Sequence, residues 1–245
     1  MSRKYAAAIV AAFMFAAVAV SASDFWVSKD WKQWSKDDCE KLLSDSPWAH
    51  TWRKGDGVGV DPSKAGLGYA AGDQFVFAIQ LRSALPIRQA IVRQLQFQQK
   101  YDKMNDAQRS DFDKQADQIL TRSYDNSILV HVDFYKGILG PVLLGDLRRY
   151  PQELETMDVT LATSDKTRIK ASRVELSKTQ GSFDAVFPRS SDAGPILKEG
   201  QGHFWIQFVR PAVLGIGLDA KTFPGGPVEI EFDPAKMVVG GKLLY

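Results

Sequence analysis

After residue 125 the chain is a series of short β-prone segments separated by turn residues, and this pattern constrains the fold most strongly. One such segment, at 75–81, precedes seven others. The seven lie at 128–134, 158–162, 167–176, 183–187, 204–209, 228–232 and 237–243. Several short strands at modest spacing are typical of antiparallel sandwiches and barrels rather than of parallel sheets. The sequence therefore predicts a mainly β protein, α+β by content, built on an antiparallel β-sandwich of about eight strands.

A helical insertion is predicted between the first two of these strands, at about 85–121. Ile87, Ile91 and Leu95 recur every four residues, which places them on one face of a helix. A second helix is indicated at about 105–120, where aspartates near the start favour the helix dipole. The insertion is thus expected to contain two helices.

The segment 25–52 holds five of the six tryptophans and the single cysteine. Trp31 and Trp34 are three residues apart, and Trp48 and Trp52 are four apart. Both spacings place side chains on one face of a helix. We therefore predict short N-terminal helices whose tryptophan and leucine faces pack against the sandwich.

Two helix starts are indicated in this segment. Ser35 followed by Asp38 is a weaker form of the capping box, because the usual third residue is Glu or Gln. Ser46 and Pro47 predict a second helical turn, with serine as the N-cap and proline in the first position. Cys39 shares the face of two leucines, so a buried thiol beneath the tryptophans is expected. A lone cysteine forms no internal disulfide.

The first 22 residues have the parts of a secretory signal peptide. Arg3 and Lys4 precede an apolar run, and small residues lead to an expected cleavage after Ala22. The run is shorter than the roughly 20 residues that span a bilayer, so a retained anchor is disfavoured and no stable span is expected after cleavage. Cleavage lowers the net charge from +2 to zero, because it removes two bases and no acid. A neutral chain lacks the basic surface of nucleic-acid-binding proteins.

These features divide the chain into four parts. They are a signal peptide at 1–22, a Trp-rich helical cap at 23–52, a Gly-rich linker at 53–73, and the β-sandwich with its helical insertion at 74–245. The expected location is the periplasm or the extracellular space. Glycines of the linker resemble phosphate-binding loops only superficially, because Gly-Lys-Ser/Thr is missing.

Several short pieces together resemble a family of uncharacterised exported bacterial proteins of similar length. The pieces are Trp34, Leu42-Leu43, Ser46-Pro47-Trp48-Ala49, Ser83-Ala84-Leu85-Pro86, Arg88-Gln89-Ala90, Phe232, Lys236-Met237-Val238 and Gly241-Lys242-Leu243. The resemblance spans most of the mature chain. It implies a shared exported fold and no known activity.

Sequence motifs for catalysis and metal binding are missing. His50, His131 and His203 have no partner histidine at zinc-ligand spacing. The Gly-x-Ser-x-Gly elbow of acyl-transfer enzymes is missing too. Cys39 is flanked by acids, which disfavour a reactive thiolate. We therefore assign no catalytic residue, metal ligand or cofactor, although the sequence leaves open whether the three histidines converge in space.

The candidate ligand-binding residues are tryptophans. Trp26, Trp31, Trp34, Trp48 and Trp52 could form an aromatic platform that stacks on sugar rings or grips a partner. Hydrophobic packing is the favoured alternative, because the spacing is helical and leucines lie nearby.

Two apolar, glycine-punctuated runs are the other feature of interest, at 137–145 and 211–218. Exposed together, they would form a patch for a protein or lipid contact. Buried loops or core strands are the favoured interpretation.

The leading hypothesis is an exported non-enzymatic β-sandwich protein with a structural or protein-interaction role at the cell envelope. Its partner would be another envelope protein. One alternative is a carbohydrate- or lipid-binding module that uses the tryptophans or the apolar loops. A second alternative is a hydrolase with a His/carboxylate site assembled in space. Whether the protein is an enzyme stays open, with the negative answer favoured, and the oligomeric state is not determined by sequence.

Overall fold

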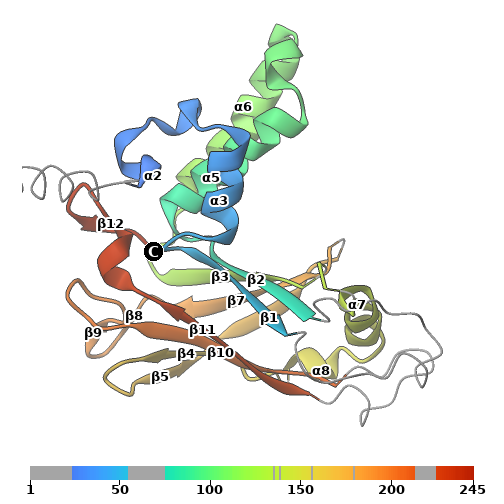
Figure 1. Cartoon of the computed structure of the whole chain (residues 1–245), viewed down its shortest axis with the longest axis vertical. Coiled ribbons are helices and arrows are strands. Elements are labelled where there is room, and N and C mark those ends of the chain that lie inside the picture. Colours follow the sequence, from blue (N-terminus) through green and yellow to red (C-terminus); the bar gives the residue numbers. More distant parts are fainter. Residues whose placement is uncertain are drawn as a thin grey trace, which may run out of the picture.

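Two antiparallel sheets pack face to face and form the body of the protein (Figure 1), which confirms the predicted α+β class. The computed structural model describes residues 24–54, 75–134, 136–137, 139–155, 157–178, 180–212 and 225–245. The first sheet has the order β1 (Ala49–Lys54), β2 (Phe75–Leu81), β3 (Ser127–Asp133), β7 (Ser182–Pro188) and β6 (Arg173–Leu176). The second has the order β11 (Gly226–Phe232), β10 (Phe204–Arg210), β4 (Thr160–Thr163) and β5 (Arg168–Lys170).

The core between the sheets is built from residues that alternate along the strands. In β10, Phe204, Ile206 and Phe208 are buried, while the residues between them are more exposed. The Phe208 ring meets Phe77 of β2 and Phe183 of β7 edge to face, with centroids 5.5 and 5.6 Å apart. Such pairs contribute about 0.5–1.5 kcal/mol beyond their area burial. Aromatic contacts therefore hold the two sheets together.

The predicted helical insertion is confirmed. Helix α5 (Leu85–Gln98), the 3-10 turn η2 (Tyr101–Lys103) and helix α6 (Asp106–Thr121) form a hairpin that projects from the sandwich (Figure 1). Arg88 of α5 donates to three backbone carbonyls at the C-terminal end of α6. These carbonyls would otherwise lack partners, because a helix leaves its last four unpaired.

The N-terminal cap contains helix α2 (Phe25–Ser28), the 3-10 turn η1 (Trp31–Gln33) and helix α3 (Lys36–Ser44). The predicted capping box of α3 is confirmed: Ser35 Oγ accepts from the Asp38 N–H at 3.1 Å, and the Asp38 carboxylate accepts from the Ser35 N–H at 2.8 Å. The buried face of α3 carries the predicted cysteine and two leucines. Aspartate thus replaces the usual Glu or Gln.

The predicted helical turn at 46–52 is wrong, because most of these residues form the edge strand β1. Ser46 and Ala49 make an isolated bridge, and β1 pairs with β2 so that Trp52 lies opposite Phe77. A four-residue spacing fits one face of a helix, but it is also even and therefore fits one face of a strand. The Trp-rich segment thus contributes a strand to the sandwich.

The predicted strand at 167–176 is divided into β5 and β6, which belong to different sheets. Ile169 and Val174 both pack against the core. They are five residues apart, an odd number, so one continuous strand would turn them to opposite faces. The break between the two strands allows both side chains to face inward.

Two further predictions need correction in element type. The described part of the apolar run at 137–145 is mostly buried, as favoured, but it lies largely in helix α7 (Gly140–Arg149). The predicted strand at 237–243 is a small hairpin of β12 (Val238–Val239) and β13 (Lys242–Leu243). Its two-residue loop is Gly240-Gly241, with φ of 58° and 75°, as a type I′ turn requires.

The remaining elements are helix α8 (Gln152–Glu155), the 3-10 turn η3 (Pro234–Met237) and a hairpin of β8 (Ser190–Ser191) and β9 (Gly194–Pro195). Three predictions lie wholly or mostly outside the described residues: the signal peptide at 1–22, the linker at 53–73 and the apolar run at 211–218. Among the helices that the structure describes, none has the length and apolar character needed to cross a membrane.

Candidate ligand-binding cleft

The two sheets meet differently at their two sides. On one side the chain runs from β5 into β6 across two residues, so the sheets are joined covalently. On the other side the edge strands β1 and β11 contact each other without pairing (Figure 1). There the His50 ring of β1 packs on the Phe232 ring of β11, with centroids 4.9 Å apart. A cleft opens along this unpaired side.

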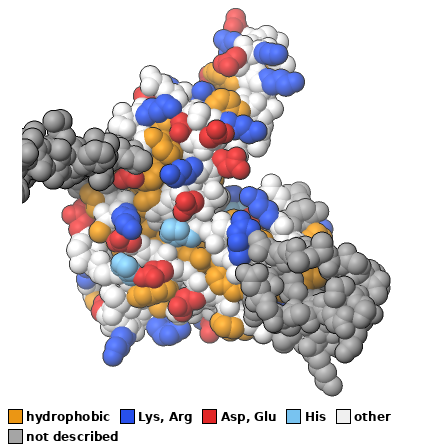
Figure 2. Space-filling model, viewed as in Figure 1, with side chains coloured by type: hydrophobic (Ala, Val, Ile, Leu, Met, Phe, Trp, Pro, Cys, Tyr) orange, Lys and Arg blue, Asp and Glu red, His pale blue; other side chains and the backbone are white. Residues whose placement is uncertain are grey.

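The cleft consists of two adjoining cavities of about 460 and 450 Å³, which share Asp45, His50 and Glu231. The larger one is lined on its apolar side by Trp26 and Phe232, among others. Its polar lining also contains Asp24, Ser46, His203, Asp233 and Lys236. Figure 2 shows histidine, carboxylate and apolar side chains close together in the middle of this face. Both volumes fall within the range of about 300–1,000 Å³ that is usual for small-molecule sites.

Two histidines, His50 and His203, line the cleft, and their surroundings differ. His203 Nδ1 is hydrogen-bonded to the Glu231 carboxylate, and both side chains are about half exposed. His50 is partly buried, and this burial lowers its pKa below the ordinary value, although the Asp45 carboxylate acts in the opposite direction. His50 is therefore mainly neutral near pH 7.

The four carboxylates of the cleft are not equally satisfied. Glu231 is bonded to His203, and Asp233 lies 3.6 Å from the Lys236 ammonium and also accepts from a backbone N–H. The Asp24 and Asp45 carboxylates have no side-chain partner among the described residues, and both residues are exposed. Arg53 lines the smaller cavity and has a partner of its own. The cleft therefore holds carboxylates that the fold does not neutralise.

The five candidate tryptophans differ in how exposed they are and in where they lie. Trp34 and Trp48 are 1% and 0% exposed, so neither is accessible as a platform. Trp31 and Trp52 are half-buried, against the α5–α6 hairpin and against Phe77 respectively. Trp26, also half-buried, is the one that lines the cleft. The platform hypothesis is thus reduced to Trp26.

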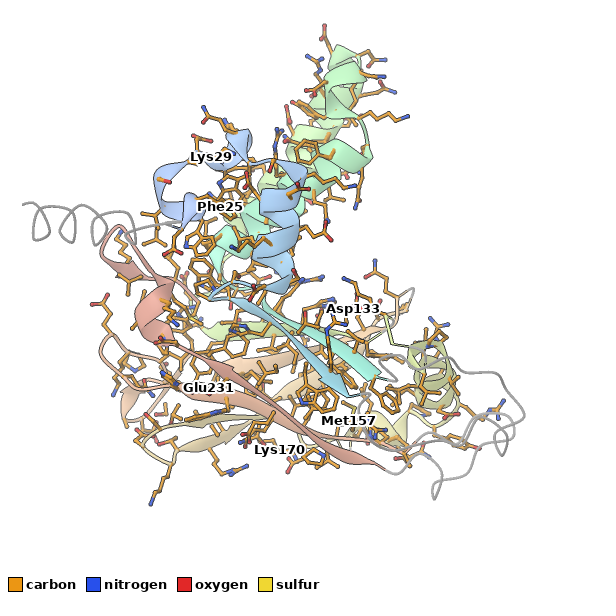
Figure 3. The ribbon with its side chains drawn as sticks, viewed as in Figure 1. Phe25, Lys29, Asp133, Met157, Lys170 and Glu231 are labelled. Carbon is orange, nitrogen blue, oxygen red and sulfur yellow. The ribbon has the colours of Figure 1, made fainter. Side chains whose placement is uncertain are left out.

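His131 lies apart from the other two histidines, on β3. It is 5% exposed, and its Nδ1 lies 2.7 Å from the Asp184 Oδ1 of β7. Burial lowers the pKa of His131, while the bond to Asp184 opposes this shift. In the first sheet His131 is in register with Ala49, whereas His50 is in register with Val132, so the two side chains point to opposite faces of the sheet. Figure 3 shows Asp133 of β3 to the right of Glu231 of the cleft. His131 therefore does not belong to a site shared by the three histidines.

Cys39 is fully buried, and burial raises its pKa to about 11. A thiol with this pKa is almost entirely protonated near neutral pH, and only the thiolate is a strong nucleophile. This agrees with the prediction of a buried, unreactive cysteine.

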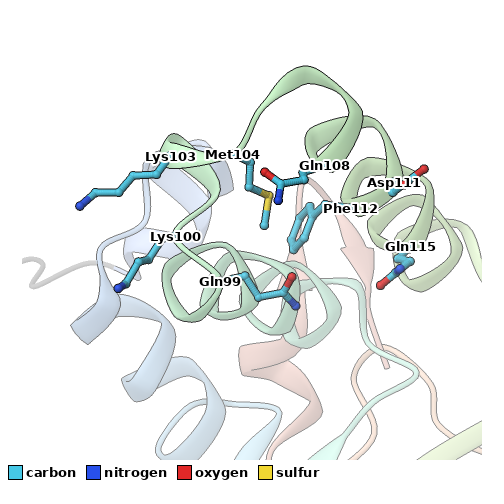
Figure 4. Close-up of a pocket in the computed structure, with 8 residues that line it drawn as sticks. All are labelled: Gln99, Lys100, Lys103, Met104, Gln108, Asp111, Phe112 and Gln115. Carbon is cyan, nitrogen blue, oxygen red and sulfur yellow. The ribbon is translucent and has the colours of Figure 1, made fainter.

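A further cavity of about 500 Å³ lies in the α5–α6 hairpin (Figure 4). Gln99, Gln108, Met104 and Phe112 surround it, while Lys100 and Lys103 point to one side. Its lining carries no histidine and no tryptophan. We regard the cleft as the better candidate, because aromatic, imidazole and carboxylate groups meet there.

Sequence reasoning named His50, His203 and Trp26 but missed Asp45 and Glu231. No local signal identifies these acids, since a cleft at the meeting of two sheet edges is a property of the tertiary fold. Among the described residues, no group of three or more His, Cys, Asp or Glu side chains is placed to hold a metal ion. Comparisons with protein-family models, curated proteins and solved structures found no match, so the family resemblance stays a prediction.

Proposed function

We propose that this chain is an exported carbohydrate-binding protein and that its binding site is the cleft between β1 and β11. The observation that carries the proposal is the meeting of Trp26, His50 and the His203–Glu231 pair around one cavity. These groups come from three distant parts of the chain. Export follows from the predicted signal peptide.

The chemistry of the lining suits a sugar. A sugar ring has an apolar face of C–H groups and an edge of hydroxyl groups, so it needs an aromatic surface next to hydrogen-bonding groups. Trp26 offers aromatic surface, and the Glu231 and Asp45 carboxylates accept hydrogen bonds from hydroxyls. Bonds to a charged acceptor are about twice as strong as neutral ones.

The other two functions considered have less support. The protein-interaction hypothesis drew on export, β content, the missing catalytic motifs and the potential exposure of two apolar runs. The leucines of α7 in the first run are buried. The hydrolase hypothesis keeps two histidines and several acids in the cleft, but the hydroxyls of Ser44, Ser46 and Thr51 that line it donate to backbone carbonyls and not to a histidine. A binding role requires neither exposed apolar runs nor a hydroxyl bonded to a histidine.

The test is binding of soluble oligosaccharides to the purified full chain, measured by calorimetry across cello-, xylo-, malto- and chito-oligosaccharides and their de-acetylated forms. We expect one of these series to bind and Trp26→Ala to weaken that binding by at least tenfold. Trp31→Ala is the matched control, because Trp31 is also half-buried but lies outside the cleft. It should bind like the wild type.

Glu231→Gln is the second variant, in case Trp26→Ala fails to fold. Glu231 is half exposed, so its amide replacement should fold and bind more weakly. The proposal is wrong if no oligosaccharide binds, or if Trp26→Ala and Glu231→Gln both bind like the wild type.

A further inference from the structure

We infer that the sugar recognised by the cleft carries a free amine, so that the ligand is an amino sugar with a protonated ammonium group. This inference rests on the proposed function and specifies the ligand of the same site. It follows from the charge of the cleft and from which of its acids the fold leaves unpaired.

The cleft is negatively charged. Its two cavities are lined by the four carboxylates of Asp24, Asp45, Glu231 and Asp233, against the cations Lys236 and Arg53. His50 adds little positive charge at neutral pH, since burial disfavours its protonated form. A ligand with a positive charge would relieve the repulsion among these acids.

The unpaired acids point to the position of the ammonium. Glu231 and Asp233 already have partners in the fold. Asp45 has no side-chain partner among the described residues, and it lies close enough to His50 to influence its pKa. An ammonium bound here would lie beside the mainly neutral His50 ring and pair with Asp45. A neutral sugar would leave this carboxylate without a counter-charge.

Trp26 distinguishes an amino sugar from a simple cation. Lysine-rich peptides would also be attracted to the carboxylates, but charge alone makes no use of an aromatic wall. Trp26 and Phe232 line the same cavity as Asp45. A sugar ring with an ammonium substituent uses both features, because its apolar face contacts the indole while the ammonium reaches the acid.

The experiment compares two oligosaccharides of equal length, the glucosamine tetramer and the N-acetylglucosamine tetramer, by calorimetry with the full chain near pH 6. The two ligands differ in whether the nitrogen is charged. We expect the glucosamine tetramer to bind at least tenfold more tightly, which corresponds to the loss of one charge-assisted contact. Added salt should weaken its binding, since part of the attraction is electrostatic.

Asp45→Asn should reduce the preference for the amine to threefold or less. Glu229→Gln is the control, because Glu229 is an acid of the same strand as Glu231 but lines neither cavity. The control should keep the full preference. A preference that Asp45→Asn leaves unchanged would contradict the assignment of this carboxylate.

The failures of the two proposals are distinguishable. Equal binding of both tetramers, or tighter binding of the acetylated one, overturns the inference and leaves carbohydrate binding intact. Binding of neither tetramer, nor of any other oligosaccharide, overturns the proposed function. If tetralysine binds as tightly as the glucosamine tetramer, the cleft recognises positive charge alone. That result overturns the inference in favour of a basic peptide.

Discussion

The tryptophans of the N-terminal segment differ in burial and in the hydrogen bonds of their indole N–H groups, although the Trp26 ring packs edge to face on Trp48 with centroids 5.9 Å apart. Trp34 and Trp48 are fully buried, and their indole N–H groups donate to backbone carbonyls of Lys29 and Leu244. Trp26 is half-buried, and its indole nitrogen lacks a partner among the described residues. Buried N–H groups usually have partners, so the first pair is organised as core and Trp26 is not. One Trp-rich segment thus serves both the fold and the cleft.

The largest expected effect on the free energy of unfolding comes from a change at Trp48. We call Trp34 and Trp48 the core tryptophans. Trp48→Ala empties a fully buried site and removes the bond to Leu244, which lies 196 residues away. We expect the free energy of unfolding to fall by about 3–5 kcal/mol, the usual range for truncation of a buried aromatic. Urea denaturation of both proteins measures this difference. A loss below about 1 kcal/mol would show that Trp48 does not belong to the core.

The rate at which a reagent modifies the Cys39 thiol measures how often the structure around the core tryptophans opens. It is fully buried with a pKa of about 11, so the native protein should not react with a thiol reagent near pH 8. Modification should then require opening of the structure, and Trp48→Ala should accelerate it by about a hundredfold or more if opening is global. Rapid labelling of the native wild type would show that the segment opens independently of the core.

His131 is buried within the first sheet and His50 is partly buried in the cleft, and this burial predicts how stability depends on pH. Burial lowers the pKa of His131 and of His50 in the folded state. The unfolded chain therefore binds protons first as the pH falls, so the stabilisation present above about pH 6.5 is lost below it. The charged groups around His131 are Asp184, Asp133 and Arg82.

Urea denaturation at about pH 7.5 and about pH 5.5 should show a lower free energy of unfolding at the acidic value. His131→Asn removes one of the two histidines whose pKa is lowered by burial and should reduce this difference, although Asp184 loses its partner. An equal stability at both pH values would contradict the burial of His131.

Local sequence patterns predicted most of the fold but not the cleft. The capping box at Ser35, the α5–α6 insertion and six of the eight strand positions depend on neighbouring residues, and they were found. Strand β1 was missed because an even spacing of tryptophans fits a helix and a strand equally. The cleft was missed because Asp45, His50 and Glu231 meet only when the edges of two sheets come together.

The smallest expected effect is on Trp26, and it tests the comparison most directly. Trp26→Ala removes a half-buried ring without a hydrogen bond among the described residues, so the free energy of unfolding should fall by about 1 kcal/mol, as for an ordinary substitution. Denaturation beside Trp48→Ala provides the scale. Equal losses in the two variants would mean that both tryptophans are structural, and weakened sugar binding by Trp26→Ala would then reflect damage to the fold. A small loss of stability with a large loss of binding would separate the role of Trp26 in the cleft from that of the core tryptophans.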